Sequence, residues 1–127
     1  MKPADMGVRA DFHMHTEFSG DSDAPVRAML DAALERGMKA VCITDHIDED
    51  YPADSVTGTN PFLFDLDQYF QVLRGIKKEY ADRLDLRIGV ELGLQPHLGE
   101  RYRRMTEKYP FDFVIGSTHL VDNTDPY

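Results

Sequence analysis

The sequence has few cysteines, no tryptophan and no long apolar run. Cys42 is the only cysteine among its 127 residues, so no intramolecular disulfide can form. It lies in an apolar run, and we therefore expect a buried, inert thiol of the kind found in a reducing cytosol. No apolar run approaches the roughly 18 residues of a membrane span, and residues 1–10 lack the apolar stretch of a signal peptide. These absences favour a cytoplasmic protein.

Basic residues are outnumbered as well. Lys and Arg total 14, Asp and Glu total 23, and the formal net charge is −9. Nucleic-acid backbones and anionic membrane surfaces are both bound by clustered Lys and Arg, so the charge argues against either partner. Acidic side chains also gather around metal cations, which a whole-chain sum does not reveal.

Composition and length limit the fold. Apolar residues make up 42% of the chain, which excludes a disordered or low-complexity sequence. The length predicts one domain over residues 1–127 with a single core. A complete eight-stranded α/β barrel is excluded, because that fold typically takes about 250 residues.

Strand and helix signals alternate along the chain. We expect strands over residues 8–12, 40–44, 84–90 and 111–115. The first helix is predicted to begin after Asp23 as N-cap, with Pro25 in its first turn, and to end at Gly37. Asp65 is predicted to cap a second helix, and a third spans about residues 98–108. This βαβαβαβ order predicts an α/β fold with a parallel sheet and right-handed crossovers.

Potential metal ligands occur at the carboxyl end of each predicted strand, where parallel sheets place their ligand sites. In an extended segment, side chains two residues apart point to the same side, so His13 and His15 can reach one cation. A glutamate can bridge two cations through its two oxygens. Mixed imidazole and carboxylate ligation suits zinc, manganese or iron better than calcium. The candidates are His13, His15, His46, Glu91 and His119.

Each of these residues also has an ordinary explanation when taken singly. An isolated His-x-His is a weak signal, Glu91 could be a surface acid and His119 a hydrogen-bonded histidine. The joint placement on four strand ends favours a metal site. Asp11 and Asp45 each lie near a candidate ligand, and we expect one or both to accept a hydrogen bond from a ligand imidazole. His97 is interpreted as a loop histidine.

The motifs that contain these residues resemble those of the PHP (polymerase and histidinol phosphatase) superfamily. They are residues 11–16 (DFHMHT), 43–46 (ITDH), 89–91 (GVE) and 116–119 (GSTH). Residues 64–69 (FDLDQY), 89–97 (GVELGLQPH) and 109–126 (YPFDFVIGSTHLVDNTDP) further resemble the histidinol-phosphate phosphatase branch. The resemblance implies that the chain corresponds to the N-terminal half of a distorted (β/α)7 TIM-like barrel.

The resemblance also implies a chemistry, with up to three divalent metals at the strand ends. The first metal would be held by His13 and His15, and Glu91 would bridge it to a second metal bound by His119. The third metal would be held by His46 together with Asp21, which stands six residues after the His-x-His pair, where many members have a histidine. The implied reaction is hydrolysis of a phosphate monoester, L-histidinol phosphate, to L-histidinol and phosphate, a step of histidine biosynthesis. The catalytic residues would be His13, His15, Glu91 and His119, acting through the bound metals.

The family pattern continues with a further histidine ligand and an Asp-x-His pair, and this sequence has no histidine after His119. We therefore expect weak or no phosphatase activity from the chain, partial metal occupancy and self-association through the exposed edge of the fourth strand. The alternatives are another PHP phosphoesterase acting on nucleotides or phosphotyrosine, and a non-catalytic metal-binding fragment. A polymerase-associated nuclease is disfavoured by the acidic charge.

Overall fold

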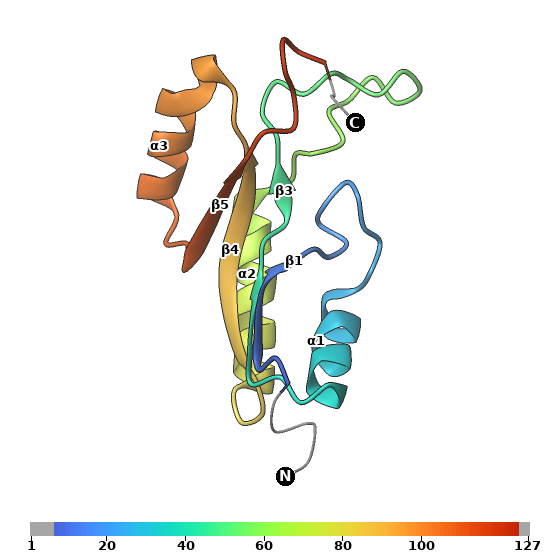
Figure 1. Ribbon diagram of the computed structural model, residues 1–127, viewed down its shortest axis with the longest axis vertical. Coiled ribbons are helices and arrows are strands. Elements are labelled where there is room, and N and C mark those ends of the chain that lie inside the picture. The colour runs from blue at the N-terminus through green and yellow to red at the C-terminus, as the bar shows by residue number, and fades with distance from the viewer. Residues whose placement is uncertain (1–6, 125–127) are drawn as a thin grey trace.

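One parallel sheet carries the fold in the computed structural model, which describes residues 7–124; part of the segment expected to lack a signal peptide lies outside this range. The sheet runs along the long axis of the molecule (Figure 1). Its strands are β1 (Ala10–Met14), β2 (Ala40–Ile43), β3 (His46–Ile47), β4 (Asp85–Gly93) and β5 (Phe113–Ser117). The predicted parallel α/β architecture is confirmed.

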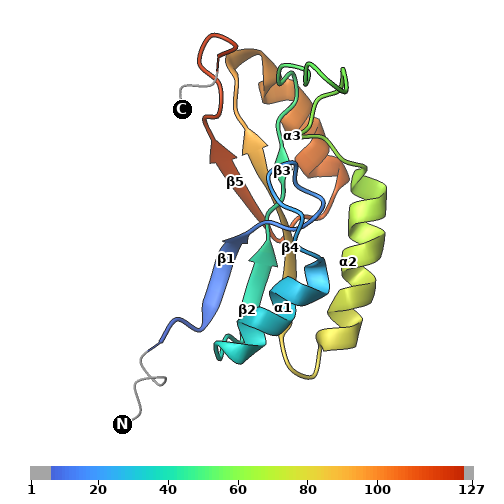
Figure 2. The ribbon, with the colours of Figure 1, turned by 90° about the vertical axis from the view of Figure 1, so that its right-hand side faces the viewer.

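Strand β4 is the centre of the sheet. β2 and β3 lie in succession along one edge of β4, β5 pairs with its other edge, and β1 pairs with β2. All pairs are parallel, so the carboxyl ends meet at one end of the molecule (Figure 2). In this register Glu91 lies beside His46 on one side and Ile115 on the other.

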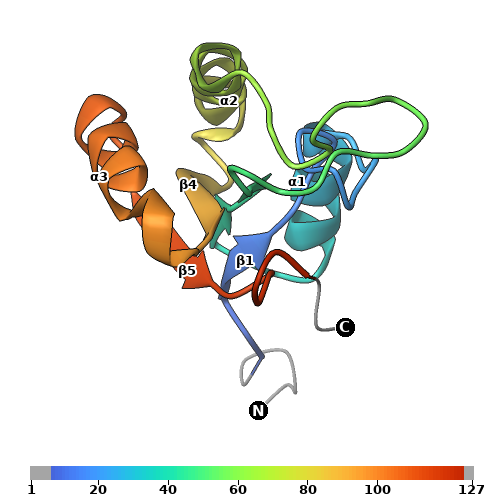
Figure 3. The ribbon, with the colours of Figure 1, turned by 90° about the horizontal axis from the view of Figure 1, so that it is seen from above.

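The helices α1 (Val26–Glu35), α2 (Leu66–Tyr80) and α3 (Gly99–Lys108) surround one face of the curved sheet (Figure 3). A short 3₁₀ helix, η2 (Pro96–Leu98), precedes α3. This arrangement is a half-barrel, with helices outside and the opposite face of the sheet free of them among the residues described.

The core lies between the helices and the sheet. Tyr69, Leu73 and Ile76 of α2 are buried in one apolar cluster with Leu86 and Val90 of β4. Each buried aliphatic side chain of this size contributes roughly 1.5–3 kcal/mol relative to its exposed state. The cluster therefore fixes the strands that carry the polar groups at the other end of the sheet.

Helix ends follow the predictions at two of three points. The carboxylate of Asp65 caps α2 by accepting from the N–H groups of Asp67 and Gln68. Gly37 ends the first helix in a left-handed conformation, with φ of 79°, and donates to the carbonyl of Leu34.

The prediction for Asp23 was wrong. Pro25, with φ of −59° and ψ of 144°, occupies the N-cap position of α1, and no side chain caps that helix. The local turn is closed instead by the Ser22 hydroxyl, which accepts from the N–H of Ala24. A carboxylate two residues before the N-cap is too far back to serve the first turn.

The strand boundaries also differ from the predictions. The first strand begins two residues later, at Ala10, where its pairing with Ala40 of β2 starts. The second strand is interrupted after Ile43, and β3 was not predicted. β4 continues to Gly93, because β3 pairs with Glu91 and Leu92 on one edge and β5 pairs as far as Gly93 on the other. The last strand is displaced to residues 113–117.

The predicted buried thiol is confirmed. Cys42 is free, fully buried in β2 and without a disulfide. Burial raises the pKa of the Cys42 thiol to about 12, so the thiolate is not populated near neutral pH.

Candidate metal centre

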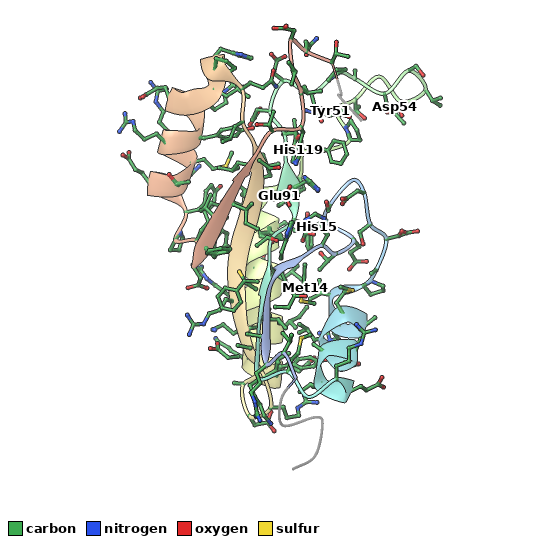
Figure 4. All side chains as sticks on the ribbon, in the orientation of Figure 1. Met14, His15, Tyr51, Asp54, Glu91 and His119 are labelled. Atoms are coloured by element: carbon green, nitrogen blue, oxygen red, sulfur yellow. The ribbon has the colours of Figure 1, made fainter. Side chains whose placement is uncertain are left out.

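Five polar side chains converge from four strand ends, and Figure 4 labels three of them, His15, Glu91 and His119. Strand β1 carries His13 and leads to His15, β3 begins with His46, β4 carries Glu91, and His119 follows β5 by two residues. Because parallel strands end at the same edge, residues up to 106 positions apart in the sequence meet here. The structure thus brings together all five candidate ligands that the sequence places at the carboxyl ends of strands.

Glu91 lies at the centre of this group with only 4% of its surface exposed. Its Oε1 lies 2.5 Å from Nε2 of His13 and 3.1 Å from Nε2 of His15. Its Oε2 lies 2.8 Å from Nε2 of His119 and 3.6 Å from Nδ1 of His46. Each oxygen therefore faces imidazole nitrogens from a different part of the sheet, as a bridging carboxylate would.

The potential ligand atoms form three overlapping groups. In each group, every ligand atom lies no more than 4.8 Å from the others. The first contains His13, His15 and Glu91, and the third contains His46, Glu91 and His119. The second adds Asp21, whose Oδ2 lies 3.1 Å from Nδ1 of His15 and 3.0 Å from Nε2 of His46. Asp21, inferred from resemblance and not from a strand end, is thus placed with the others.

The donor set fits divalent cations. His15 faces a carboxylate with each ring nitrogen, and so does His119, yet a neutral imidazole has a single N–H. Nδ1 of His46 and Oδ1 of Asp48 are buried without a hydrogen-bond partner. Buried polar atoms are normally satisfied, so the unpaired Nδ1 of His46 and the imidazole nitrogens that face Glu91 and Asp21 fit a cation held by His15, His46, His119 and these two carboxylates.

The electrostatics of the metal-free cluster agree with this interpretation. Burial alone would raise the pKa of Glu91, but hydrogen bonds and charge from the surrounding imidazoles lower that pKa to about 2. Burial alone would lower the pKa of His15 and His46, but the facing carboxylates outweigh it and raise both pKa values. The cluster therefore holds ionised carboxylates that bind positive charge, whether carried by protons or by metals.

Asp11 and Asp45 do not bond an imidazole, contrary to the expectation. Asp11 accepts from the main-chain N–H of His13 at 2.9 Å. Asp45 is fully buried, and its two oxygens accept from the main-chain N–H and the hydroxyl of Thr16. Asp11 bonds the backbone of His13, and Asp45 bonds the backbone of Thr16, the residue after His15. Both carboxylates therefore fix the His-x-His segment and not an imidazole ring.

Two further residues near the cluster, Asp48 and His97, differ in their relation to it. The motifs did not include Asp48, yet it is 2% exposed and its Oδ2 lies 2.5 Å from Nδ1 of His119. His97 belongs to none of the three groups, and its Nε2 lies 2.7 Å from Oδ2 of Asp50 on the surface. The signal for Asp48 was its place two residues after His46, on the same side of an extended segment.

Fold and site together define an α/β protein with histidines and carboxylates clustered at the carboxyl ends of a half-barrel. The chain belongs to the PHP domain family, whose model matches residues 11–127. Among the described residues no helix has the length and apolar character needed to cross a membrane.

Proteins similar in sequence to this chain are named as histidinol-phosphatases or probable histidinol-phosphatases. A histidinol-phosphatase of Lactococcus lactis is 29% identical over 119 residues, which cover 94% of this chain and 42% of the relative. A probable histidinol-phosphatase of Clostridium acetobutylicum is 35% identical, with 92% of this chain and 42% of the relative covered. The chain thus spans less than half the length of these relatives.

Solved structures show the same likeness. The crystal structure of histidinol phosphate phosphatase from Lactococcus lactis, complexed with zinc, L-histidinol and phosphate, matches with a TM-score of 0.84 at 29% identity. The match covers 94% of this chain and 43% of that one. A putative histidinol phosphatase from Listeria monocytogenes matches with a TM-score of 0.74 at 27% identity.

Proposed function

We propose that residues 1–127 form the incomplete PHP domain of a metal-dependent phosphate monoester hydrolase that acts on L-histidinol phosphate. The observation that carries this proposal is Glu91, whose two oxygens face imidazoles of His13 and His15 on one side and His119 on the other. The solved relative that contains zinc, L-histidinol and phosphate supports the metal and the substrate.

Up to three divalent ions would occupy the three ligand groups, with zinc preferred and manganese or iron as alternatives. Bound there, divalent ions supply positive charge for phosphate oxygens and activate water at neutral pH. Glu91 stays ionised at any physiological pH because its pKa is about 2, so it is always available as a ligand. The second ligand group consists of His15, Asp21 and His46, and Asp21 comes from the loop that follows β1.

The reaction would convert L-histidinol phosphate and water to L-histidinol and phosphate, with cleavage of the phosphate ester bond, as a cytoplasmic step of histidine biosynthesis. The buried, unpaired thiol of Cys42 is compatible with a reducing compartment. The formal net charge of −9 favours neither nucleic acid nor an anionic membrane as a partner.

We infer that the 127-residue chain has weak activity. The side chain of His13 is 59% exposed although its nitrogen faces Glu91, so one flank of the first group is open to solvent. A centre open on one side excludes water poorly. The first group, His13, His15 and Glu91, is nevertheless expected to keep the most metal.

The test is phosphate release by the zinc-loaded chain from L-histidinol phosphate, a nucleoside monophosphate and phosphotyrosine. Weak release that is fastest from L-histidinol phosphate and is lost in Glu91→Gln is the expected result. The matched control is Glu107→Gln on the exposed face of α3, which pairs with Arg103 and leaves release unchanged. Faster release from either other ester would refute the substrate, and turnover at rates typical of enzymes, about 1–10³ s⁻¹, would refute the incomplete domain.

Self-association is the second part of the proposal. β1 and β5 lie at the two edges of the sheet, and Phe12 and Phe113, one on each, pack edge to face while remaining 36% and 41% exposed. Open edges and exposed aromatic rings favour pairing with a second copy. Sedimentation velocity at increasing concentration should show a growing dimer, and Phe113→Lys should reduce it. A strictly monomeric wild-type chain would contradict this part.

A non-catalytic metal-binding module is the second candidate function. It is favoured by the same exposure of His13 and by the 42% of the relatives' length that the chain spans. Tight zinc binding with no phosphate release from any ester in the panel would favour this candidate over the hydrolase.

A further inference from the structure

Asp48 is a buried carboxylate that lies outside the three ligand groups and touches one of their members. It follows β3 directly, and 2% of its surface is exposed. Its Oδ2 lies 2.5 Å from Nδ1 of His119, whereas Nε2 of the same ring lies 2.8 Å from Oε2 of Glu91. The imidazole of His119 is therefore held between a carboxylate of the candidate centre and one behind it.

The position of Asp48 is fixed on both its backbone and its side chain. Its N–H donates to the carbonyl of Phe62 at 2.9 Å, and its own carbonyl accepts from the side-chain amide of Asn60 at 2.7 Å. The carboxylate rests against the α-carbon of Gly93, where a β-carbon would collide with the carboxyl carbon and both oxygens. Glycine at position 93 therefore leaves the space that Asp48 fills.

The geometry has a chemical consequence for His119. A neutral imidazole carries one N–H, and a carboxylate facing Nδ1 keeps the proton on that nitrogen. Nε2 then presents its lone pair on the side of Glu91, where a cation would be shared. A carboxylate behind a ligand imidazole in this way fixes both the ring orientation and the tautomer.

We propose that Asp48 is a positioning residue that orients His119 for a divalent cation at the group of His46, Glu91 and His119. The proposal rests on the metal centre of the proposed function. The second oxygen of Asp48 lies 3.6 Å from Nδ1 of His46, so the same carboxylate borders two members of that group.

The first test is zinc binding, measured by competition with a chromophoric chelator. Asp48→Asn keeps the shape and removes the charge, and it should weaken zinc binding about 10–100-fold. Asp50→Asn is the matched control, because Asp50 lies two residues on, is exposed and contacts His97 instead. The control should bind zinc as the wild type does. Circular dichroism and thermal unfolding without zinc establish that each variant is folded.

Gly93→Ala is the second variant. It leaves Asp48 in the sequence but pushes its carboxylate away, so it should weaken zinc binding in the same direction. Wild-type affinity in folded Asp48→Asn or Gly93→Ala would overturn the positioning role while leaving the metal centre standing. A wild-type chain that binds no zinc would overturn both.

The tautomer gives a readout that needs no variant. Long-range ¹H–¹⁵N spectra of the zinc-bound wild type should show His119 protonated at Nδ1, and Asp48→Asn should lose this single defined state. Protonation at Nε2 in the wild type would overturn the proposal. Loss of a whole zinc equivalent in Asp48→Asn with the tautomer unchanged would make Asp48 a ligand itself and would overturn the positioning role equally.

Discussion

The carbonyl oxygen of Pro61 rests directly against the α-carbon of Gly20, so close that no β-carbon fits between them. This contact joins the loop after β1, which carries Asp21, to the end of the long segment that follows β3. Phe62 continues the contact and packs on the ring of His46, with centroids 5.3 Å apart. The loop that carries Asp21 and the segment that leads from Asp48 to Pro61 are thus held together at one glycine.

Gly20→Ala should lower the free energy of unfolding and weaken zinc binding together. The added methyl group would meet main-chain atoms that cannot rotate away, and overpacking of this kind typically costs about 1–3 kcal/mol. The loop must move, and Asp21 moves with it. Urea denaturation gives the first effect and chelator competition the second.

Gly75→Ala is the matched control for that substitution. Gly75 lies in the exposed part of α2, and a β-carbon there meets nothing within 4 Å. Alanine is the better helix former, so this variant should gain about 0.5–1 kcal/mol with zinc binding unchanged. If the two variants changed stability in the same direction, the assigned role of Gly20 would be wrong.

Tyr69→Phe should lower the free energy of unfolding, because it removes a hydrogen bond between α2 and the sheet. The hydroxyl of Tyr69 is fully buried and donates to the carbonyl of Gly89 at 2.9 Å, and burial raises its pKa well above 10.0. Its loss leaves a buried carbonyl unsatisfied at a cost of about 1–3 kcal/mol. Tyr109→Phe removes an exposed hydroxyl that bonds Asp67 and should leave the urea midpoint unchanged. Equal midpoints for the two variants would contradict this account.

The fold and the convergence of the five candidate ligands were predictable because the signals are local. Apolar periodicity marks each helix and strand, and parallel strand ends must share an edge, so His46 and Glu91 are brought together by topology. Asp48 was not predictable in the same way. It is one of three consecutive acids, and only the pairing of β3 with β4 and the space at Gly93 turn the first of them inward.

The three ligand groups make unequal use of the histidines. His46 belongs to two groups and His97 to none. His46→Ala should therefore lose the zinc of the second and third groups and keep that of His13, His15 and Glu91, so its zinc content, measured by atomic emission after dialysis, should fall below that of His97→Ala, which should retain the wild-type amount. Removal of zinc with a chelator should lower the melting temperature of His97→Ala as it does that of the wild type. Equal zinc content in the two variants would show that the two groups containing His46 hold no zinc.

Stability should depend on pH in opposite directions with and without zinc. In the metal-free fold the pKa values of His15 and His46 are raised above 6.5, so their protonation stabilises the fold fully below pH 6.5, and this contribution is lost as pH rises through the folded pKa values. The pKa of Glu91 is lowered from 4.5 to about 2, so its contribution is full above pH 4.5 and is lost as pH falls toward 2. The metal-free chain should therefore be most stable between these limits.

Zinc binds the deprotonated imidazoles, so its stabilisation should grow as pH rises above 6.5. Thermal unfolding at about pH 5.5 and about pH 8, with a chelator and with saturating zinc, measures both dependences. We expect the higher melting temperature at the lower pH without metal, and the larger zinc-induced increase at the higher pH. Glu91→Gln, which removes the shared carboxylate, should flatten both trends. A zinc-induced increase of equal size at the two pH values would show that the metal does not displace protons from His15 and His46.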